Sequence, residues 1–139
     1  LNGVGAAGVS LASAERLLRN TPLDRFFEVM AVMLNGERAV GENLVVLFEF
    51  TDIGERWLVD IENAVLHARK LAEKQRGVEP VNSSVVLTHD LLIRIMTGNA
   101  GARELVFSDE LNVEGSRLDL ARFFSLLDAP AVDFAIVTP

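Results

Sequence analysis

The sequence predicts an α+β domain in which helices cover a mainly antiparallel, five-stranded sheet. Three features of the pattern lead to this prediction. Three short apolar strands follow one another with tight turns between them, which is typical of an antiparallel meander. An amphipathic helix precedes these strands, and two further strands alternate with short helices after them. The chain has 139 residues, the usual length of one domain with one core.

The first element is a helix predicted over residues 23–34. Thr21 is a good N-cap, and Pro22 suits the first helical position. Apolar side chains then recur at steps of three and four residues, namely Leu23, Phe26, Phe27, Met30 and Leu34. The dipeptide Asn35-Gly36 is a typical helix stop. The periodicity therefore predicts one helix with a single buried face.

Three strands are predicted next, over residues 44–50, 56–61 and 64–68. The second strand alternates along its length, with Trp57, Val59 and Ile61 on one face. Residues 51–55 form the first turn, and Glu62-Asn63 forms the second. Because both connections are short, each strand is expected to run antiparallel to the one before it.

The second half of the chain is predicted to alternate strands with short helices. Residues 70–80 form a charged, exposed loop, which leads to a strand over 83–87. A helix capped by Thr88-His89-Asp90 follows, to about residue 96. A weaker helical pattern covers 101–107, and a short strand covers 111–114.

The last predicted helix begins after Gly115 and ends near residue 127. Ser116 is its N-cap, with Asp119 as the capping-box partner. The apolar tail, residues 132–139, is expected to pack against the domain. Residues 1–20 are predicted to be a linker or fragment edge, poorly ordered or packed as a helix, so that the domain spans 21–139.

Charge and composition argue against several classes of function. The net charge is −7, with thirteen Lys and Arg scattered among twenty acidic residues, so nucleic acid is not an expected partner. There is no cysteine, which excludes disulfides, thiolate catalysis and Cys-zinc sites. Apolar runs such as Leu44 to Phe48 are far shorter than the ~20 residues that cross a bilayer, so no membrane span is expected.

No catalytic constellation is recognisable in the sequence. The two histidines, His67 and His89, lie in no metal-binding spacing, and each is interpreted as a surface or capping residue. No G-x-S-x-G elbow accompanies the serines, and the carboxylates are spread along the chain. We therefore expect neither a metal site nor an active site in this domain.

The aromatic residues favour an apolar role. The chain has eight Phe, one Trp and no Tyr, and half of its residues are hydrophobic. A Phe-rich interior without Tyr hydroxyls has few polar anchors, which suits core packing or a featureless apolar ligand. Composition leaves both possibilities open.

Several short motifs resemble the C-terminal domain of bacterial alkyl sulfatases. Residues 26–36 end in Met-Ala-Val-Met-Leu-Asn-Gly, and residues 44–52 end in Phe-Glu-Phe-Thr-Asp. Residues 61–66 are similar to that family's Glu-Asn-(Gly/Ala)-Val-Leu hairpin. The segments 87–98, 113–116 and 134–139 are similar to its helix, strand and chain-end signatures. The resemblance covers residues 21–139, with the motifs in the family's order and spacing.

The resemblance implies a sterol-carrier-protein-2-like fold with an apolar tunnel between the sheet and its helices. In the whole enzymes this domain follows a metallo-β-lactamase-type zinc hydrolase domain and a helical dimerisation domain, which become its expected partners. The family's zinc-binding motifs have no counterpart here, so no cofactor and no catalytic residue are expected in this chain. The parent family often works in the periplasm or outside the cell, but the sequence itself predicts no compartment.

The ligand expected from the resemblance is a long alkyl chain or lipid. The predicted walls of its binding site lie on the first helix, the sheet and the two later helices. The candidate lining residues are Phe27, Met30, Leu34, Phe48, Phe50, Trp57, Val59, Leu91, Ile95, Phe123 and Leu127.

Three functional hypotheses follow from the sequence. The first is an accessory domain that binds hydrophobic substrate or alcohol product for a catalytic domain. The second is a structural or interaction domain whose own side chains fill its core. The third, an independent enzyme, has no motif to support it.

Overall fold

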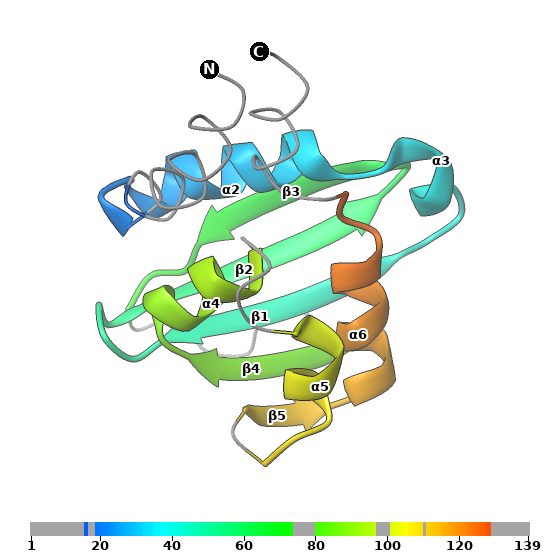
Figure 1. Ribbon diagram of the computed structural model, residues 1–139. Helices are drawn as coiled ribbons and strands as arrows, with labels where there is room; N and C mark the ends of the chain where they lie inside the picture. Colours follow the sequence, from blue (N-terminus) through cyan, green and yellow to red (C-terminus); the bar gives the residue numbers. More distant parts are fainter. Residues whose placement is uncertain (1–15, 17–18, 74–79, 97–100, 110, 129–139) are drawn as a thin grey trace, which may run out of the picture.

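The computed structural model describes residues 16, 19–73, 80–96, 101–109 and 111–128. These residues form the helices α2 (Leu23–Met33), α3 (Gly36–Ala39), α4 (His89–Met96), α5 (Ala102–Val106) and α6 (Arg117–Ser125). The strands are β1 (Leu44–Phe50), β2 (Glu55–Glu62), β3 (Val65–Lys70), β4 (Ser83–Leu87) and β5 (Asn112–Gly115). They form one five-stranded sheet in the order β3-β2-β1-β4-β5, and Figure 1 shows α2, α4, α5 and α6 on the same face of it.

The predicted α+β class and the five strands are confirmed, but the sheet is mixed. The pairs β1–β2, β2–β3 and β4–β5 are antiparallel, whereas β4 pairs with β1 in parallel, with Phe50 opposite Leu87. A parallel neighbour requires a crossover connection, and this one lies between the end of β3 at Lys70 and the start of β4 at Ser83. The sequence predicts an exposed loop over 70–80, of which residues 74–79 lie outside the described residues. Lys70 is not part of a loop but ends β3, which lies at one edge of the sheet, whereas β4 lies beyond β1.

The face of the sheet that meets the helices is set by β1. Its inward residues, Leu44, Val46, Phe48 and Phe50, are buried, while the alternate residues are half-buried or exposed. The register continues this face sideways, because Phe48 lies opposite Trp57 on β2. Alternate residues of a strand point to the same face of the sheet, and paired residues on neighbouring strands share that face. The side of the sheet toward the helices is therefore one continuous apolar surface.

The helix ends differ in part from the predictions. Pro22, rather than Thr21, occupies the N-cap position of α2, and no side chain caps that helix. The helix ends at Met33, so Asn35 does not cap it; its side chain accepts a hydrogen bond from the Arg38 N–H and starts α3. The physical reason is that α3 follows at once and uses the Asn35 side chain as its own N-cap.

Two predicted N-caps in the second half are confirmed. Thr88 Oγ1 accepts the Leu91 N–H of α4 at 3.0 Å, and Ser116 Oγ accepts the Asp119 N–H of α6 at 3.0 Å. The reciprocal half of the capping box is not formed as predicted, because the Asp119 carboxylate accepts the side-chain amide of Asn82 at 3.2 Å. The predictions for residues 1–15, 97–100 and 132–139 lie outside the described residues.

Asn82 ties three elements together. Its side-chain oxygen accepts the Val45 N–H at 2.8 Å, and its backbone N–H donates to the Val45 carbonyl at 2.8 Å. Its own carbonyl accepts the Ser116 N–H at 2.9 Å. One residue therefore fixes the starts of β1, β4 and α6 relative to one another.

The β2–β3 hairpin contains a strained residue. Glu62 pairs with Val65, so Asn63 and Ala64 form a two-residue loop with φ values of 55° and 60°. Positive φ at both positions is the requirement of a type I′ turn. Asn tolerates this conformation, but the Cβ of Ala64 makes it unfavourable.

We predict that Ala64→Gly stabilises the domain. Relief of the left-handed strain at residue 64 raises the free energy of unfolding. The loss of one half-buried methyl group and the added entropy of glycine in the unfolded chain lower it by a smaller amount, so we expect a net gain of about 0.5 kcal/mol. Urea unfolding monitored by Trp57 fluorescence measures the change. The control Ala72→Gly, at an exposed position after β3, should give no gain. A lower unfolding free energy for Ala64→Gly would contradict the assignment of strain.

Candidate functional site

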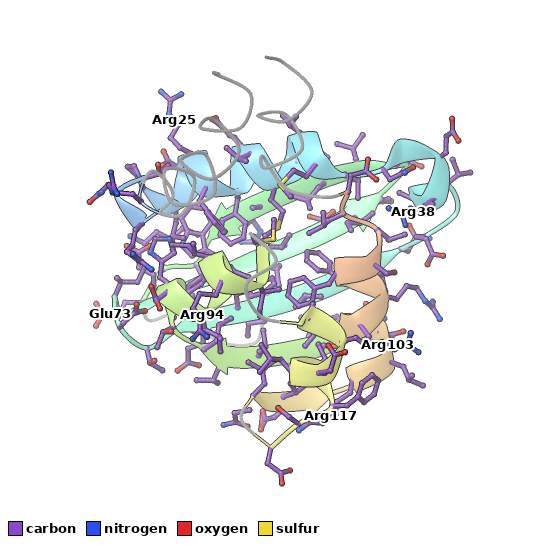
Figure 2. All side chains as sticks on the ribbon, viewed as in Figure 1. Arg25, Arg38, Glu73, Arg94, Arg103 and Arg117 are labelled. Atoms are coloured by element: carbon purple, nitrogen blue, oxygen red, sulfur yellow. The ribbon has the colours of Figure 1, made fainter. Side chains whose placement is uncertain are left out.

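The space between α2 and the sheet is occupied by aromatic rings. The ring of Phe27 lies 5.1 Å from that of Trp57, 6.0 Å from that of Phe48 and 6.3 Å from that of Phe50, as centroid distances. Phe48 and Phe50 stack along β1 at 6.1 Å. These four side chains are almost completely buried. Figure 2 shows side chains from the helices and the sheet pointing into this space.

The aromatic cluster continues toward α6. Phe48 lies 5.8 Å from Phe123 and 6.5 Å from Phe124, and these two rings meet edge to face at 5.4 Å. Phe123 is completely buried, whereas Phe124 is half-buried and also reaches the surface between α5 and α6. Phe124 therefore contacts the buried cluster on one side and lines the surface groove on the other.

The ends of α2 and α6 are held together beside this cluster. Leu34 and Leu127 form an isolated antiparallel bridge, flanked by hydrogen bonds from Asn35 N–H to the Leu126 carbonyl at 2.8 Å and from Asp128 N–H to the Met33 carbonyl at 2.7 Å. The bridge fixes the separation of the two helices on the face of the sheet.

The structure brings most of the predicted lining residues together. Seven of them belong to the buried core, namely Phe27, Met30, Phe48, Phe50, Trp57, Val59 and Phe123. Leu34, Leu91 and Leu127 are partly buried and pack against it. Ile95 is 7% exposed and does not belong to the largest buried cluster, and the lining role of all eleven residues stays a prediction.

The helical phase of α4 decides which of its side chains meet the core cluster. The residues of this helix that face the core are His89, Leu92, Ile93 and Met96, at positions i, i+3, i+4 and i+7. Five of its eight residues are apolar. The structure selects the phase that turns His89 inward, which sequence reasoning missed because a polar residue at a helix start suggests a cap.

His89 is a core residue rather than a surface histidine. Its side chain is 8% exposed, and its ring meets Phe26 at 5.5 Å and Phe50 at 6.2 Å, both edge to face. Its backbone N–H donates to both carboxylate oxygens of Asp52, at 3.0 and 3.1 Å, which caps α4 from the β1–β2 turn. Within the described residues its buried Nε2 atom has no hydrogen-bond partner.

Burial lowers the pKa of His89 below its ordinary value of 6.5, against the attraction of Asp52, Asp90 and Glu55. Desolvation is the larger effect because it removes water from the charged imidazolium. The position of the residue in the first turn of α4 also disfavours a positive charge there. The ring is therefore neutral near neutral pH, in an apolar environment.

A groove of about 450 Å³ lies on the surface between α5 and α6. Its walls combine apolar side chains with two arginines, and the lining residues are Ala102, Arg103, Phe107, Leu118, Ala121, Arg122, Phe124 and Ser125. Phe107 and Leu118 are 50% and 70% exposed, which is unusual for large apolar side chains. Figure 2 labels Arg103 on this side of the molecule.

A second hollow, of about 900 Å³, lies beside the β1–β2 turn and the end of β3. Its lining includes Glu49, Glu73 and Arg56, together with a Lys70–Glu55 ion pair whose Nζ and Oε2 atoms are 3.4 Å apart. Although it is larger, its charged walls suit an apolar ligand less well than the groove between α5 and α6.

No group of three or more potential metal-binding side chains occurs among the residues that the structure describes. Within the same residues, no helix is long and apolar enough to cross a membrane. The described residues thus enclose apolar surface and one unpaired polar atom, Nε2 of the neutral His89. They form no metal centre.

The lowered pKa of His89 predicts a pH-dependent stability. Below about pH 6.5 the unfolded chain takes up a proton that the folded domain resists, so the free energy of unfolding falls as the pH drops toward the folded pKa. His89→Phe removes this contribution. Urea unfolding at several pH values between about 7 and 5 should therefore show a smaller loss of stability for the variant than for the wild type.

The exposed residue His67 provides the matched control for this experiment. Its ring is 70% exposed beside Asp60, so His67→Gln should leave the pH dependence close to that of the wild type. Parallel stability curves for the wild type and His89→Phe would contradict a neutral, desolvated His89.

Comparison with known proteins places this arrangement in a family. A family model described as alkyl sulfatase C-terminal matches residues 11–139. The chain is 24% identical over 139 residues to a linear primary-alkylsulfatase of Pseudomonas sp., which covers 99% of this chain and 20% of that protein. The chain thus spans about a fifth of the length of this curated relative.

Solved structures agree with this match. A stereoselective inverting sec-alkylsulfatase from Pseudomonas sp. superimposes with a TM-score of 0.68 and 25% identity, over 82% of this chain and 17% of that one. Sterol Carrier Protein 2 from Yarrowia lipolytica, in its apo form, gives a TM-score of 0.53 and 21% identity, over 73% of this chain and 85% of that one. The second likeness confirms the predicted sterol-carrier-protein-2-like fold. The region is an accessory domain rather than the catalytic one, and the chain belongs to the family of alkyl sulfatase C-terminal domains.

Proposed function

We propose that this domain binds a long alkyl chain and retains hydrophobic substrate or alcohol product for the catalytic domain of a parent alkyl sulfatase. The observation that supports the proposal is an apolar groove at α5 and α6 whose lining residue Phe124 also contacts the buried aromatic cluster. A lipid-binding role also agrees with the sterol-carrier-protein-2-like fold.

The chemistry of the walls favours a ligand without many polar groups. The rings of Phe27, Phe48, Phe50 and Phe123 offer apolar surface and no hydrogen-bonding group. Each methylene of an alkyl chain that leaves water gains ~0.8 kcal/mol, so a chain of detergent length gains several kcal/mol without any polar contact. Shape and apolar area, rather than a pattern of hydrogen bonds, would then select the ligand.

The groove supplies the binding surface in this proposal. Its volume of about 450 Å³ falls in the range of roughly 300–1,000 Å³ that is typical of small-molecule sites. Its lining includes the exposed Phe107 and Leu118 and the half-buried Phe124. An alkyl chain in the groove would contact the ring of Phe124, which packs against Phe48.

In the parent enzyme we infer two partners for this domain. The linear primary-alkylsulfatase of Pseudomonas sp. is about five times as long as this chain, so about four fifths of that enzyme lies outside the matching region. The resemblance to the family assigns that length to a zinc hydrolase domain and a dimerisation domain. The zinc ion would belong to the hydrolase domain, and this chain would contribute only the apolar site.

A structural or interaction role is the second candidate. The observation that favours it is the exposure of Phe107 and Leu118 beside α6, because large exposed apolar side chains often mark a surface that another domain covers. The aromatic rings also contact one another directly, as they would in a core with no ligand.

Titration of the purified chain with 1-dodecanol, followed by Trp57 fluorescence and calorimetry, distinguishes the two candidates. Saturable binding in the micromolar range is expected if the domain holds an alkyl chain, and Trp57 should report it because its ring contacts Phe27. Absence of saturable binding would exclude the alkyl-chain role and leave the structural one.

A groove-blocking variant tests this binding surface. Ser125 is exposed on α6 and lines the groove, so Ser125→Trp should fill it without disturbing the core. We expect about a tenfold loss of affinity for 1-dodecanol, equivalent to about 1.4 kcal/mol. The matched control is Val32→Trp, at a 76% exposed position of α2 outside the groove lining, which should bind like the wild type. Equal affinities for the two variants would refute binding in the groove.

A further inference from the structure

The groove between α5 and α6 combines an apolar strip with positive charge. Its apolar lining includes Phe107, Leu118 and Phe124. Its charged lining includes Arg103 and Arg122, and the described lining residues include no carboxylate. The whole chain, in contrast, has twenty acidic residues and a net charge of −7. The groove is therefore a locally positive surface on an acidic protein.

Arg103 supplies a positive charge that no neighbouring side chain balances. It is exposed on α5, and it forms no ion pair or hydrogen bond with the part of the chain that the structure describes. The next residue, Glu104, does not line the groove, and its carboxylate lies against Gly101 at the start of α5. Figure 2 labels Arg103 beside α6. All five N–H donors of its guanidinium group are thus available to a ligand.

The second lining arginine is already engaged in part. Arg122 Nη1 lies 3.5 Å from Glu42 Oε1 and 3.9 Å from Asp119 Oδ1, so two carboxylates share its charge. Arg122 adds to the positive field of the groove, but Arg103 is the lining cation that is free to take an anion.

The cation and the apolar strip are adjacent. Arg103 and Phe107 are four residues apart at the C-terminal end of α5, so they lie on the same side of that helix. Phe107 and Leu118 are 50% and 70% exposed, and an alkyl chain laid over them would remove their apolar surface from water. The groove thus offers a place for a hydrocarbon chain directly beside an unpaired guanidinium group.

This combination is complementary to an amphiphile with a negative head group. A guanidinium group donates two parallel hydrogen bonds to the oxygens of an anion, whereas a neutral hydroxyl group gains no charge attraction from it. A sulfate ester has three terminal oxygens and a carboxylate has two. The sulfate ester therefore suits a groove that is lined by two guanidinium groups better than the carboxylate does.

We propose that this groove binds a long-chain alkyl sulfate ester, with the sulfate group on Arg103 and the alkyl chain over Phe107 and Leu118. The inference rests on the proposed alkyl-chain binding and deepens it, because it names the charged substrate, rather than the alcohol product, as the ligand. Loss of the sulfate group removes the charge that Arg103 recognises, so the alcohol is held less tightly than the substrate.

Calorimetric titration of the chain with four dodecyl ligands, each below its micelle concentration, tests the choice of head group. We expect dodecyl sulfate to bind most tightly, followed by dodecanoate, 1-dodecanol and dodecyltrimethylammonium. Because the chain as a whole is acidic, attraction to its net charge alone would instead favour the cationic ligand. Near-ultraviolet circular dichroism at the end of each titration shows that the chain is still folded.

NMR locates the bound ligand. In ¹H–¹⁵N spectra, dodecyl sulfate should shift the backbone amides of α5 and α6 and the side-chain Nε–H of Arg103. The corresponding Nε–H of Arg25, which is 72% exposed on α2 outside the groove lining, should not shift.

Two matched substitutions test the role of the guanidinium group. Arg103→Gln keeps a polar side chain but removes the charge, so the affinity for dodecyl sulfate should fall about three- to fivefold while that for 1-dodecanol is unchanged. Arg25→Gln is the control and should bind every ligand like the wild type. Because Arg103 is exposed and unpaired within the described fold, Arg103→Gln should unfold at the same temperature as the wild type.

The outcomes separate this inference from the proposed function. Binding of none of the four ligands by the wild type would overturn both. Equal affinities for dodecyl sulfate and 1-dodecanol, unchanged in Arg103→Gln, would overturn the head-group site and leave alkyl-chain binding intact. Tighter binding of dodecanoate than of dodecyl sulfate would overturn the choice of the sulfate ester, and NMR shifts confined to other elements would overturn its place in the groove.

Discussion

Strand β1 is hydrogen-bonded to a neighbour on each side and buries one whole face, and the positions of the other elements follow from that constraint. Leu44, Val46, Phe48 and Phe50 alternate along it, so a slip of one residue would turn all four side chains away from the helices. The register with β2 brings Trp57 beside Phe48, and the parallel register with β4 places Leu87 beside Phe50. The helices can bury their own apolar faces only against this surface.

Hydrogen bonds at the rim of the sheet then position the helices over that surface. Asp52 in the β1–β2 turn caps α4, Asn82 at the start of β4 fixes the start of α6, and the Leu34–Leu127 bridge joins the ends of α2 and α6. Each contact joins residues far apart in the chain. Polar contacts at the rim thus set the separations of the elements that enclose the interior. Because these contacts lie outside it, the interior itself can be almost entirely apolar.

The sequence was sufficient for the elements that carry a clear period. The helix at Phe26 and Phe27, the alternation along β2 and the caps at Thr88 and Ser116 all follow from local patterns. The parallel β1–β4 pairing could not be predicted in this way, because it depends on a contact across the crossover between β3 and β4. The inward position of His89 in α4 was equally hidden, since a histidine at the start of a helix suggests a cap rather than a core residue.

The parallel pairing of β1 with β4 has a consequence for synthesis of the chain on the ribosome. The strands β1, β2 and β3 are contiguous and can pair as soon as they emerge, but β4 begins only at Ser83. Until then, the edge of β1 that β4 will cover is free, next to a face that carries Phe48 and Phe50. An open apolar strand edge is a template for aggregation, so the nascent domain is most vulnerable between the emergence of β3 and that of β4, which is the interval in which a chaperone would be of most use.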